Sequence, residues 1–389
     1  MGFAKVRLHY IGLCASVFLT QMCIGIAFLA TPILALEMEA SPLLIGLIGA
    51  SGGATYTVMT RIFGSASDRF SRKKLLLIAE IIQAFSMALS FLSQDPYQLI
   101  FARFVYSIGL ALYWPLSEAY IGDLVGADQL SQALTGYNVS WSSATIIGPQ
   151  LGGLLITWFF IRTPFVVALA GLLFAAVLLL PRIKVNISRS HHMAHQINDE
   201  KPMPIQKAPK IFPLAYTFLF AFTSAILNAI FPAYATQLGV SADLIGLMFL
   251  LSGLTQTLTV LLANRLQSKL EEWKILLLSS FFMFSALIMI GLTIAMPIFF
   301  VSFAIFGMGQ GMAYSTAILL VLKQSGSRRG KAAGLFESTL GIGFFLGPLV
   351  GGIFYEVGGA YPYFLGALVS LWIMVHQLFM MFRRVRINS

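Results

Sequence analysis

The sequence contains twelve apolar runs, and each is long enough to cross a lipid bilayer as a helix. A spanning helix needs about 20 consecutive, mostly apolar residues, and few charged residues interrupt these runs. The runs cover residues 8–36, 42–63, 74–93, 97–121, 131–159, 164–181, 211–236, 242–263, 274–295, 297–322, 332–355 and 361–382. This pattern predicts an all-α polytopic membrane protein that is embedded in a lipid bilayer.

The composition excludes the other broad classes of protein. Only 10% of the 389 residues are charged and 58% are hydrophobic, whereas soluble domains carry roughly 25% charged residues. Cys14 and Cys23 lie on one predicted helix, too far apart for a disulfide. A soluble enzyme, a disordered chain and a disulfide scaffold are therefore all excluded.

The basic residues form short clusters between the apolar runs. Although a net charge of +10 can indicate a nucleic-acid partner, clusters in this arrangement indicate membrane topology, because Lys and Arg favour cytoplasmic loops. With the N-terminus inside, every Lys and Arg except Arg103 and Arg162 falls in a cytoplasmic segment. We expect no nucleic-acid partner, and a multi-pass protein of the cytoplasmic (plasma) membrane with both termini in the cytoplasm.

The two halves of the sequence repeat each other across the polar segment 182–210. Three stretches recur at an offset of about 200 residues: Pro32–Ser41 as Pro232–Ser241, Gly148–Gly153 as Gly347–Gly352, and Phe101-Ala102-Arg103-Phe104 as Phe303-Ala304-Ile305-Phe306. The last match places Ile305 opposite Arg103. We predict a six-helix bundle at 1–181, a cytoplasmic linker at 182–210 and a second six-helix bundle at 211–389. Repeats of this kind place a substrate site near the membrane midplane, between the halves.

Three motifs resemble those of the major facilitator superfamily. The loop Gly64-Ser-Ala-Ser-Asp68-Arg69-Phe-Ser71-Arg72-Lys73 is similar to the family's loop signature, with Ser71 in place of its second Gly. Arg103 and Gly109 match the family's arginine motif, and Gly-Pro-x-x-Gly-Gly at 148–153 resembles a motif of its antiporters. The resemblance covers essentially the whole chain and is closest to the drug/proton antiporter-like members. It implies twelve transmembrane helices in two pseudo-symmetric six-helix bundles.

The resemblance also implies a conformational latch on the cytoplasmic side. Arg72 should pair with Asp123, and Asp68 should face the start of the helix predicted at 332–355. The latch would link the two halves while the cytoplasmic side is closed. Its candidate residues are Gly64, Asp68, Arg69, Arg72, Glu118 and Asp123.

The repeated glycine motif is interpreted as a packing device. Small residues let helix backbones approach closely in a membrane, and proline kinks a helix. We therefore expect a conformational role, without substrate contact, for Gly148, Pro149, Gly152, Gly153, Gly347, Pro348, Gly351 and Gly352.

Four ionisable residues lie within the predicted spans, where such residues are costly and mostly functional. Arg103 and Glu337 are the proton-coupling candidates, because a carboxyl group withdrawn from water favours its protonated form. Two alternatives remain open: Arg103 as a brace held by carbonyls and hydroxyls, and Glu337 as an acid hydrogen-bonded to Ser338 or Thr339. Glu118 is assigned to the latch, and Glu80 is expected to pair within its own half.

Polar and aromatic side chains on the inward-facing spans are candidates for the substrate cavity. At helical spacing, Arg103, Tyr106, Tyr113 and Trp114 share one face of a helix. The complete candidate set is Gln21, Arg103, Tyr106, Tyr113, Trp114, Asn138, Trp141, Asn228, Gln256, Gln310 and Tyr314.

These features favour a secondary active transporter that works by alternating access. The leading hypothesis is proton-coupled efflux of hydrophobic or amphipathic small molecules by a monomer, with a proton gradient as the energy source and no cofactor. The alternative is a lipid flippase or a carrier of anionic metabolites, in which Arg103 binds a carboxylate or phosphate. We expect no enzyme activity, catalytic residue or metal site, because the sequence shows no nucleophile constellation, metal cluster or phosphate-binding loop.

Overall fold

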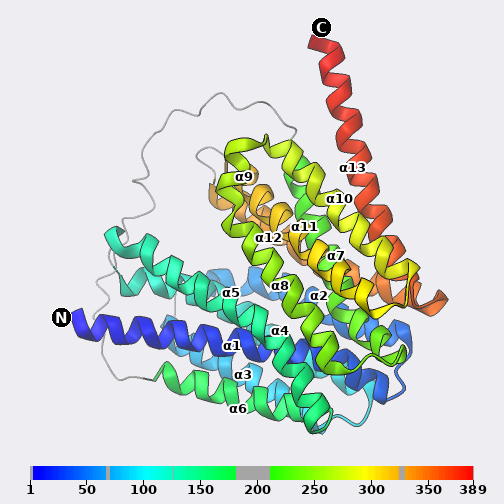
Figure 1. The fold of residues 1–389 in the computed structure, drawn as a ribbon. Coiled ribbons are helices and arrows are strands. Elements are labelled where there is room, and N and C mark those ends of the chain that lie inside the picture. The colour runs from blue at the N-terminus through cyan, green and yellow to red at the C-terminus, as the bar shows by residue number, and fades with distance from the viewer. Residues whose placement is uncertain (1–2, 67–70, 126, 181–210, 324–328, 389) are drawn as a thin grey trace.

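A computed structural model describes residues 3–66, 71–125, 127–180, 211–323 and 329–388, which form thirteen helices (Figure 1). The first six are α1 (Phe3–Glu37), α2 (Pro42–Ala66), α3 (Arg72–Leu92), α4 (Pro96–Leu124), α5 (Ala127–Trp158) and α6 (Thr163–Leu178). The other seven are α7 (Ile211–Gln237), α8 (Ala242–Leu261), α9 (Ala263–Lys269), α10 (Glu272–Leu292), α11 (Met296–Lys323), α12 (Arg329–Val357) and α13 (Tyr361–Asn388). We call α1–α6 the N-terminal half and α7–α13 the C-terminal half. The expected linker, 182–210, lies outside the described residues.

The helices confirm the predicted fold class. Ten of those in the described ranges are long and apolar enough to cross a membrane. The other two expected spans correspond to α5, which has 32 residues but is more polar, and α6, which is apolar but has 16 residues. The short helix α9 was not expected, because it lies in the polar stretch that follows the eighth apolar run.

The turns show the internal repeat at the level of the backbone. Between α1 and α2 the chain adopts a positive φ of 57° at Glu39, and between α7 and α8 it adopts a φ of 79° at Gly239. The left-handed conformation suits glycine and is uncommon for residues with a side chain. The same turn is therefore made in both halves, although only the second half has glycine there.

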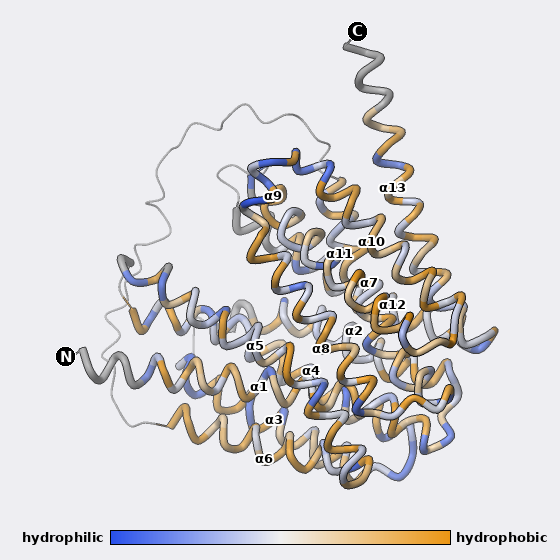
Figure 2. Tube along the Cα trace, in the orientation of Figure 1, coloured by the Kyte–Doolittle hydropathy of each residue, from blue (hydrophilic) through white to orange (hydrophobic). Residues whose placement is uncertain are grey.

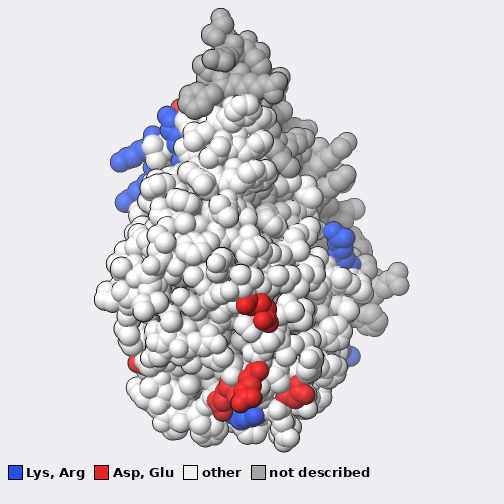
Figure 3. Space-filling model, turned by 90° about the vertical axis from the view of Figure 1, so that its right-hand side faces the viewer, with Lys and Arg blue, Asp and Glu red and all other residues white. Residues whose placement is uncertain are grey.

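Charged side chains separate toward opposite ends of the helices. On the face in Figure 3, most acidic side chains gather toward the bottom with one basic side chain among them, and the other basic side chains lie higher, several of them at the upper left. Figure 2 shows hydropathy along the chain, with hydrophobic residues along the helices and many hydrophilic ones near helix ends and turns. We call the end with Arg72, Arg265 and Lys323 the basic end, and the end with Glu37, Asp243 and Glu356 the acidic end.

Equivalent glycines pack α3 against α4 and α10 against α11. A methyl group at Gly109 would lie 2.9 Å from the Ala79 carbonyl oxygen, and one at Gly309 would lie 2.9 Å from the Ser279 carbonyl oxygen. The two helix pairs are therefore related by an offset of 200 residues. This corrects one prediction, because the structural counterpart of Arg103 is Phe303 and not Ile305.

The two halves meet along α2 with α12 and along α5 with α8. A methyl group at Gly46 would lie 2.4 Å from the Pro348 carbonyl oxygen, and one at Gly246 would lie 2.8 Å from the Pro149 carbonyl oxygen. A methyl group at Gly153 would lie 2.2 Å from the Ala242 carbonyl oxygen. Only glycine lets the backbones approach this closely, so each half docks on the proline motif of the other.

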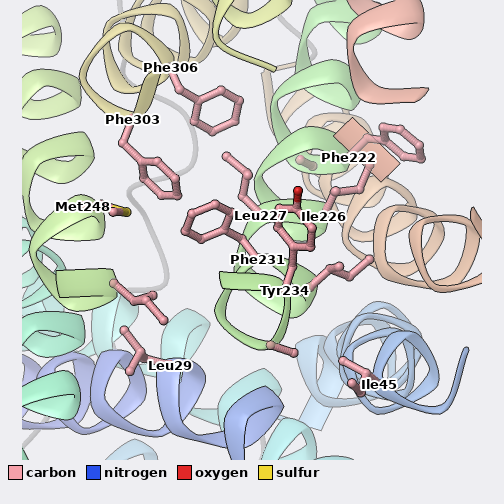
Figure 4. Close-up of a cluster of buried hydrophobic side chains, with 14 of the residues drawn as sticks. Leu29, Ile45, Phe222, Ile226, Leu227, Phe231, Tyr234, Met248, Phe303 and Phe306 are labelled. Carbon is pink, nitrogen blue, oxygen red and sulfur yellow. The ribbon is translucent and has the colours of Figure 1, made fainter. Parts of the chain in front are cut away.

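Apolar side chains from both halves form one buried cluster beside these contacts (Figure 4). Leu29 of α1 and Ile45 of α2 belong to the same cluster as Phe231 of α7 and Met248 of α8. The Phe231 ring lies 4.6 Å, centroid to centroid, from the Phe303 ring. Close packing of this cluster adds van der Waals contacts to the glycine contacts between the halves.

Two hydrogen bonds join the halves at the acidic end. The Leu43 N–H donates to Glu356 Oε1 at 3.0 Å, and the Thr157 hydroxyl donates to Asp243 Oδ1 at 3.0 Å. From this end α5 and α8 diverge toward the basic end (Figure 1). In contrast, α2 and α12 remain in contact as far as Arg61, whose Nη2 donates to Ser338 Oγ at 3.1 Å.

Replacing Gly46 with alanine is expected to separate the halves at the acidic end, because the new methyl group would collide with the backbone of α12. Thiol labelling of Ile45→Cys, in a chain without Cys14 and Cys23, measures this separation. We expect Gly46→Ala to raise the labelling rate several-fold. Gly122→Ala is the matched control, because a methyl group there meets no atom within 4 Å. Equal labelling rates in the two variants would contradict the packing role.

Candidate functional site

Two carboxyl groups from opposite halves lie within electrostatic range of each other. Glu118 of α4 and Glu337 of α12 are both exposed and lie close enough for their charges to interact. Tyr56 of α2 and Tyr314 of α11 are also within electrostatic range of both. We call Glu118 and Glu337 the carboxylate pair.

The residues next to Glu337 do not satisfy its carboxyl group. The Ser338 hydroxyl donates to the Gly334 carbonyl oxygen at 2.8 Å, and the Thr339 hydroxyl donates to the Leu335 carbonyl oxygen at 2.8 Å. The alternative in which these hydroxyls hold Glu337 is therefore wrong. Glu337 remains available to Glu118 and to molecules between the halves.

The predicted latch residues are only partly described. Arg72 Nη1 lies 2.5 Å from Asp123 Oδ1 and 3.1 Å from the Ala119 carbonyl oxygen, so the structure brings the expected pair together. This ion pair joins α3 to α4 within the N-terminal half. This ion pair does not include Glu118, which lies within electrostatic range of Glu337. Asp68 and Arg69, and the surroundings of Gly64, lie outside the described residues.

Arg103 is held by aromatic rings. Its guanidinium carbon lies 3.8 Å from the centroid of the Phe28 ring and 5.3 Å from that of Tyr106. Such cation–π contacts strengthen when the cation is withdrawn from water. The described structure gives Arg103 no hydrogen bond to a carbonyl or a hydroxyl, so the predicted brace of that kind is wrong.

The expected aromatic wall around Arg103 is not continuous. Tyr106 is buried beside Phe28. Tyr113 is completely buried and its hydroxyl lies 3.1 Å from Ser16 Oγ of α1, inside the N-terminal half. Trp114 is partly buried and packs edge-on against Tyr113 at 5.4 Å. The prediction that these residues line one cavity surface is therefore wrong for Tyr113, because helical spacing does not show which neighbour covers a face.

The remaining cavity candidates differ in how accessible they are. Those that are exposed are Asn138, Trp141 and Asn228, and those that are partly buried are Gln21, Gln256 and Tyr314. Gln310 is buried, and its Nε2 donates to Ser224 Oγ within the C-terminal half. Gln310 is therefore satisfied by its own half, contrary to its predicted place in the cavity.

The glycine motif packs against both halves. A methyl group at Gly148 would lie 2.7 Å from the Met22 carbonyl oxygen, and one at Gly347 would lie 2.5 Å from the Phe222 carbonyl oxygen. Gly152 approaches the backbone of Ile26 of α1, and Gly351 approaches the side chains of Ile226 and Ile230 of α7. Gly153 and Gly352 instead approach the opposite half, as do Pro149 and Pro348. The glycine motifs did not reveal that Gly46 and Gly246 are the residues that contact them from the opposite half. These two glycines are 200 residues apart, so the internal repeat was the signal that could have found them.

A third carboxyl group, Glu80 of α3, is completely buried. Its Oε1 lies 3.2 Å from Ser16 Oγ and 2.6 Å from Thr20 Oγ1, both on α1. Glu80 therefore finds its partners within its own half.

Solved structures show the same architecture. The nucleoside transporter NupG superposes with a TM-score of 0.79 at 17% identity, covering 96% of this chain and 99% of NupG. A bacterial homolog of the human lysosomal transporter Spinster superposes with a TM-score of 0.72 at 15% identity, covering 97% of this chain and 96% of its own. These likenesses concern the fold alone.

Sequence relatives include bacterial multidrug transporters. Multidrug resistance protein 2 of Bacillus subtilis is 24% identical over 376 residues, covering 93% of this chain and 92% of that protein. The multi-drug resistance efflux pump PmrA of Streptococcus pneumoniae is 22% identical over 248 residues, covering 61% of this chain and 60% of PmrA. The model of the Major Facilitator Superfamily matches residues 13–212 and 214–387. The chain is therefore a membrane transporter that belongs to the major facilitator superfamily.

Proposed function

We propose that this protein exports hydrophobic or amphipathic small molecules by alternating access, driven by a proton gradient. The arrangement of the halves carries this proposal, because they are joined at the acidic end and, between α5 and α8, diverge toward the basic end (Figure 1). Helices arranged in this way can rock about the joined end. The similarity to multidrug transporters of Bacillus subtilis and Streptococcus pneumoniae supports the class of substrate.

The distribution of charge supports an orientation for this cycle. Basic side chains favour the cytoplasmic side of a membrane, so the basic end is proposed to face the cytoplasm with both termini. The divergence of α5 and α8 then admits molecules from the cytoplasm, as an exporter requires.

The carboxylate pair supplies a means of coupling. Closing the basic end moves α4 and α12 toward each other and brings Glu118 closer to Glu337. Two like charges at short range disfavour each other until one takes up a proton. The other groups near the pair are Tyr56 and Tyr314, which carry no charge at physiological pH, and Arg61, which donates to Ser338 and keeps its positive charge. Either a proton or a bound cationic substrate would relieve this repulsion and permit closure on the cytoplasmic side. A proton taken up from the outside and released to the cytoplasm would then exchange for each exported molecule.

The alternative, a carrier of lipids or anionic metabolites bound by Arg103, has less support. The guanidinium of Arg103 already lies against Phe28 and Tyr106, and an anion would have to compete with these rings. The similarity to multidrug transporters also favours efflux of apolar compounds.

Glu337→Gln is expected to reduce the response of transport to a pH gradient, because it leaves one carboxyl group without its like-charged partner. Ethidium efflux into inverted membrane vesicles is the measurement, with and without an imposed gradient. We expect the gradient-driven rate to fall about tenfold, which is the change in a protonation equilibrium that one pKa unit represents. The matched control is Glu37→Gln, an exposed acid at the acidic end. An unchanged gradient response in Glu337→Gln would exclude this residue from coupling.

Asp123→Asn is expected to destabilise the protein modestly, because it breaks the ion pair with Arg72, whose side chain is 28% exposed. A loss of about 1 kcal/mol in the free energy of unfolding is typical of such a pair. Thermal unfolding in detergent is the measurement. The charge-swapped double variant, Arg72→Asp with Asp123→Arg, should recover part of the loss. Disruption of the more exposed Lys274–Glu271 pair should cost less, and an equal cost would show that the Arg72 pair has no special structural role.

A further inference from the structure

The surroundings of Glu80 suggest an additional function inside the N-terminal half. Its side chain has no exposed surface, and α1 provides the two hydroxyls that contact Oε1. The other oxygen, Oε2, has no hydrogen-bond partner in the structure. One turn further along α3, the amide oxygen of Gln83 is buried and unpartnered too. Burying polar atoms without hydrogen-bond partners costs free energy, and the cost is larger for a charged group. The environment of Glu80 therefore depends on its protonation state.

The hydrogen bonds of Thr20 indicate that Glu80 carries a proton. The Thr20 hydroxyl has one hydrogen but lies near two oxygens, the Ser16 carbonyl at 2.8 Å and Glu80 Oε1 at 2.6 Å. Other helical threonines here, such as Thr31 and Thr217, donate to the carbonyl four residues earlier. If Thr20 does the same, the short contact with Glu80 requires a hydrogen supplied by the carboxyl group.

The charges around Glu80 lead to the same protonation state. The groups that face it are Ser16, Thr20 and Cys23 of α1, and Tyr106 and Tyr113 of α4. None of these side chains carries a positive charge, and the nearby arginine of α4, Arg103, lies against Phe28. A carboxylate without a cation is strongly disfavoured in an apolar interior, whereas a neutral carboxylic acid fits these partners.

The other half shows that the fold does not need an acid at this position. By the offset of 200 residues, Ser280 of α10 corresponds to Glu80 of α3, and Tyr216 of α7 corresponds to Ser16 of α1. The Tyr216 hydroxyl lies 3.3 Å from Ser280 Oγ and also bonds Gln377 Oε1 of α13, so this network is neutral. An acid in only one of two equivalent positions indicates a function beyond packing.

We propose that Glu80 is a proton-binding site of the N-terminal half, separate from the carboxylate pair, and that it carries a proton in this conformation. Helix α1 forms one wall of the site and also packs against α5 and α7, which belong to different halves. A movement of α1 relative to α3 would change the oxygens around Glu80 and release the proton. Only this release during transport rests on the proposed function; the bound proton does not.

Infrared spectroscopy of the purified protein in lipid nanodiscs tests the bound proton directly. A protonated carboxyl group has a C=O stretching band distinct from the bands of a carboxylate. We expect such a band at neutral pH in the wild type and in Glu337→Gln, and its loss in Glu80→Gln. The Glu80→Gln variant should fold, because the glutamine amide can donate a hydrogen bond to Thr20 Oγ1 as the protonated acid does. Thr20→Val should shift the band by removing its hydrogen-bond partner, while Ser280→Ala should leave it in place. A band that persists in Glu80→Gln would overturn the proposal.

A second measurement tests release of the proton. Tetraphenylphosphonium is added to the protein in unbuffered solution, and a pH-sensitive dye reports the protons released. We expect Glu80→Gln to release fewer protons than the wild type. Equal release in the two proteins would overturn the part of the proposal that concerns transport. If the wild type showed the infrared band but no gradient-driven ethidium efflux, the proposed function would fail while the proton site would stand.

Discussion

The contact between glycine and the backbone of the opposite half is the constraint on which the rest of the structure depends. At Gly46 and Gly246 each half approaches the proline carbonyl of the other so closely that a single methyl group would not fit. Hydrophobic burial does not drive helices together in a membrane, where lipid is equally apolar, so close packing and polar contacts must hold them. Because these contacts and the Glu356 and Asp243 hydrogen bonds lie toward the acidic end, α5 and α8 diverge toward the basic end, while α2 and α12 stay in contact as far as Arg61 and Ser338.

The two halves share a backbone but differ in their polar side chains. Where the N-terminal half has Glu80 and Arg103, the C-terminal half has Ser280 and Phe303. The Phe303 ring packs into an aromatic cluster around Phe231 (Figure 4), whereas the equivalent position in the N-terminal half holds a cation above Phe28. A symmetric scaffold therefore contains an asymmetric set of ionisable groups. We interpret the C-terminal core as mainly structural, whereas the N-terminal core holds the proton-binding site proposed at Glu80, in addition to the carboxylate pair between the halves.

Much of the fold was predictable from the sequence, because apolar runs of this length allow few alternatives to membrane-spanning helices. The repeat also predicted the equivalence of the glycine motifs. The site was less predictable, since helical spacing places residues on a face without showing what covers that face. Tyr113 and Gln310 were expected in the cavity but are satisfied inside their own halves. Glu118 lies near Asp123 in sequence, yet its charge is within range of Glu337 in the other half.

Distances between spin labels on opposite halves test the central claim most directly. One pair, at Trp158 of α5 and Val357 of α12, reports on the acidic end, and a second, at Gln132 of α5 and Arg265 of α9, reports on the basic end; all four side chains are exposed. The account predicts that acidification with tetraphenylphosphonium shortens the distance at the basic end and lengthens it at the acidic end. If both distances changed in the same direction, or neither changed, rocking about the glycine contacts would be contradicted.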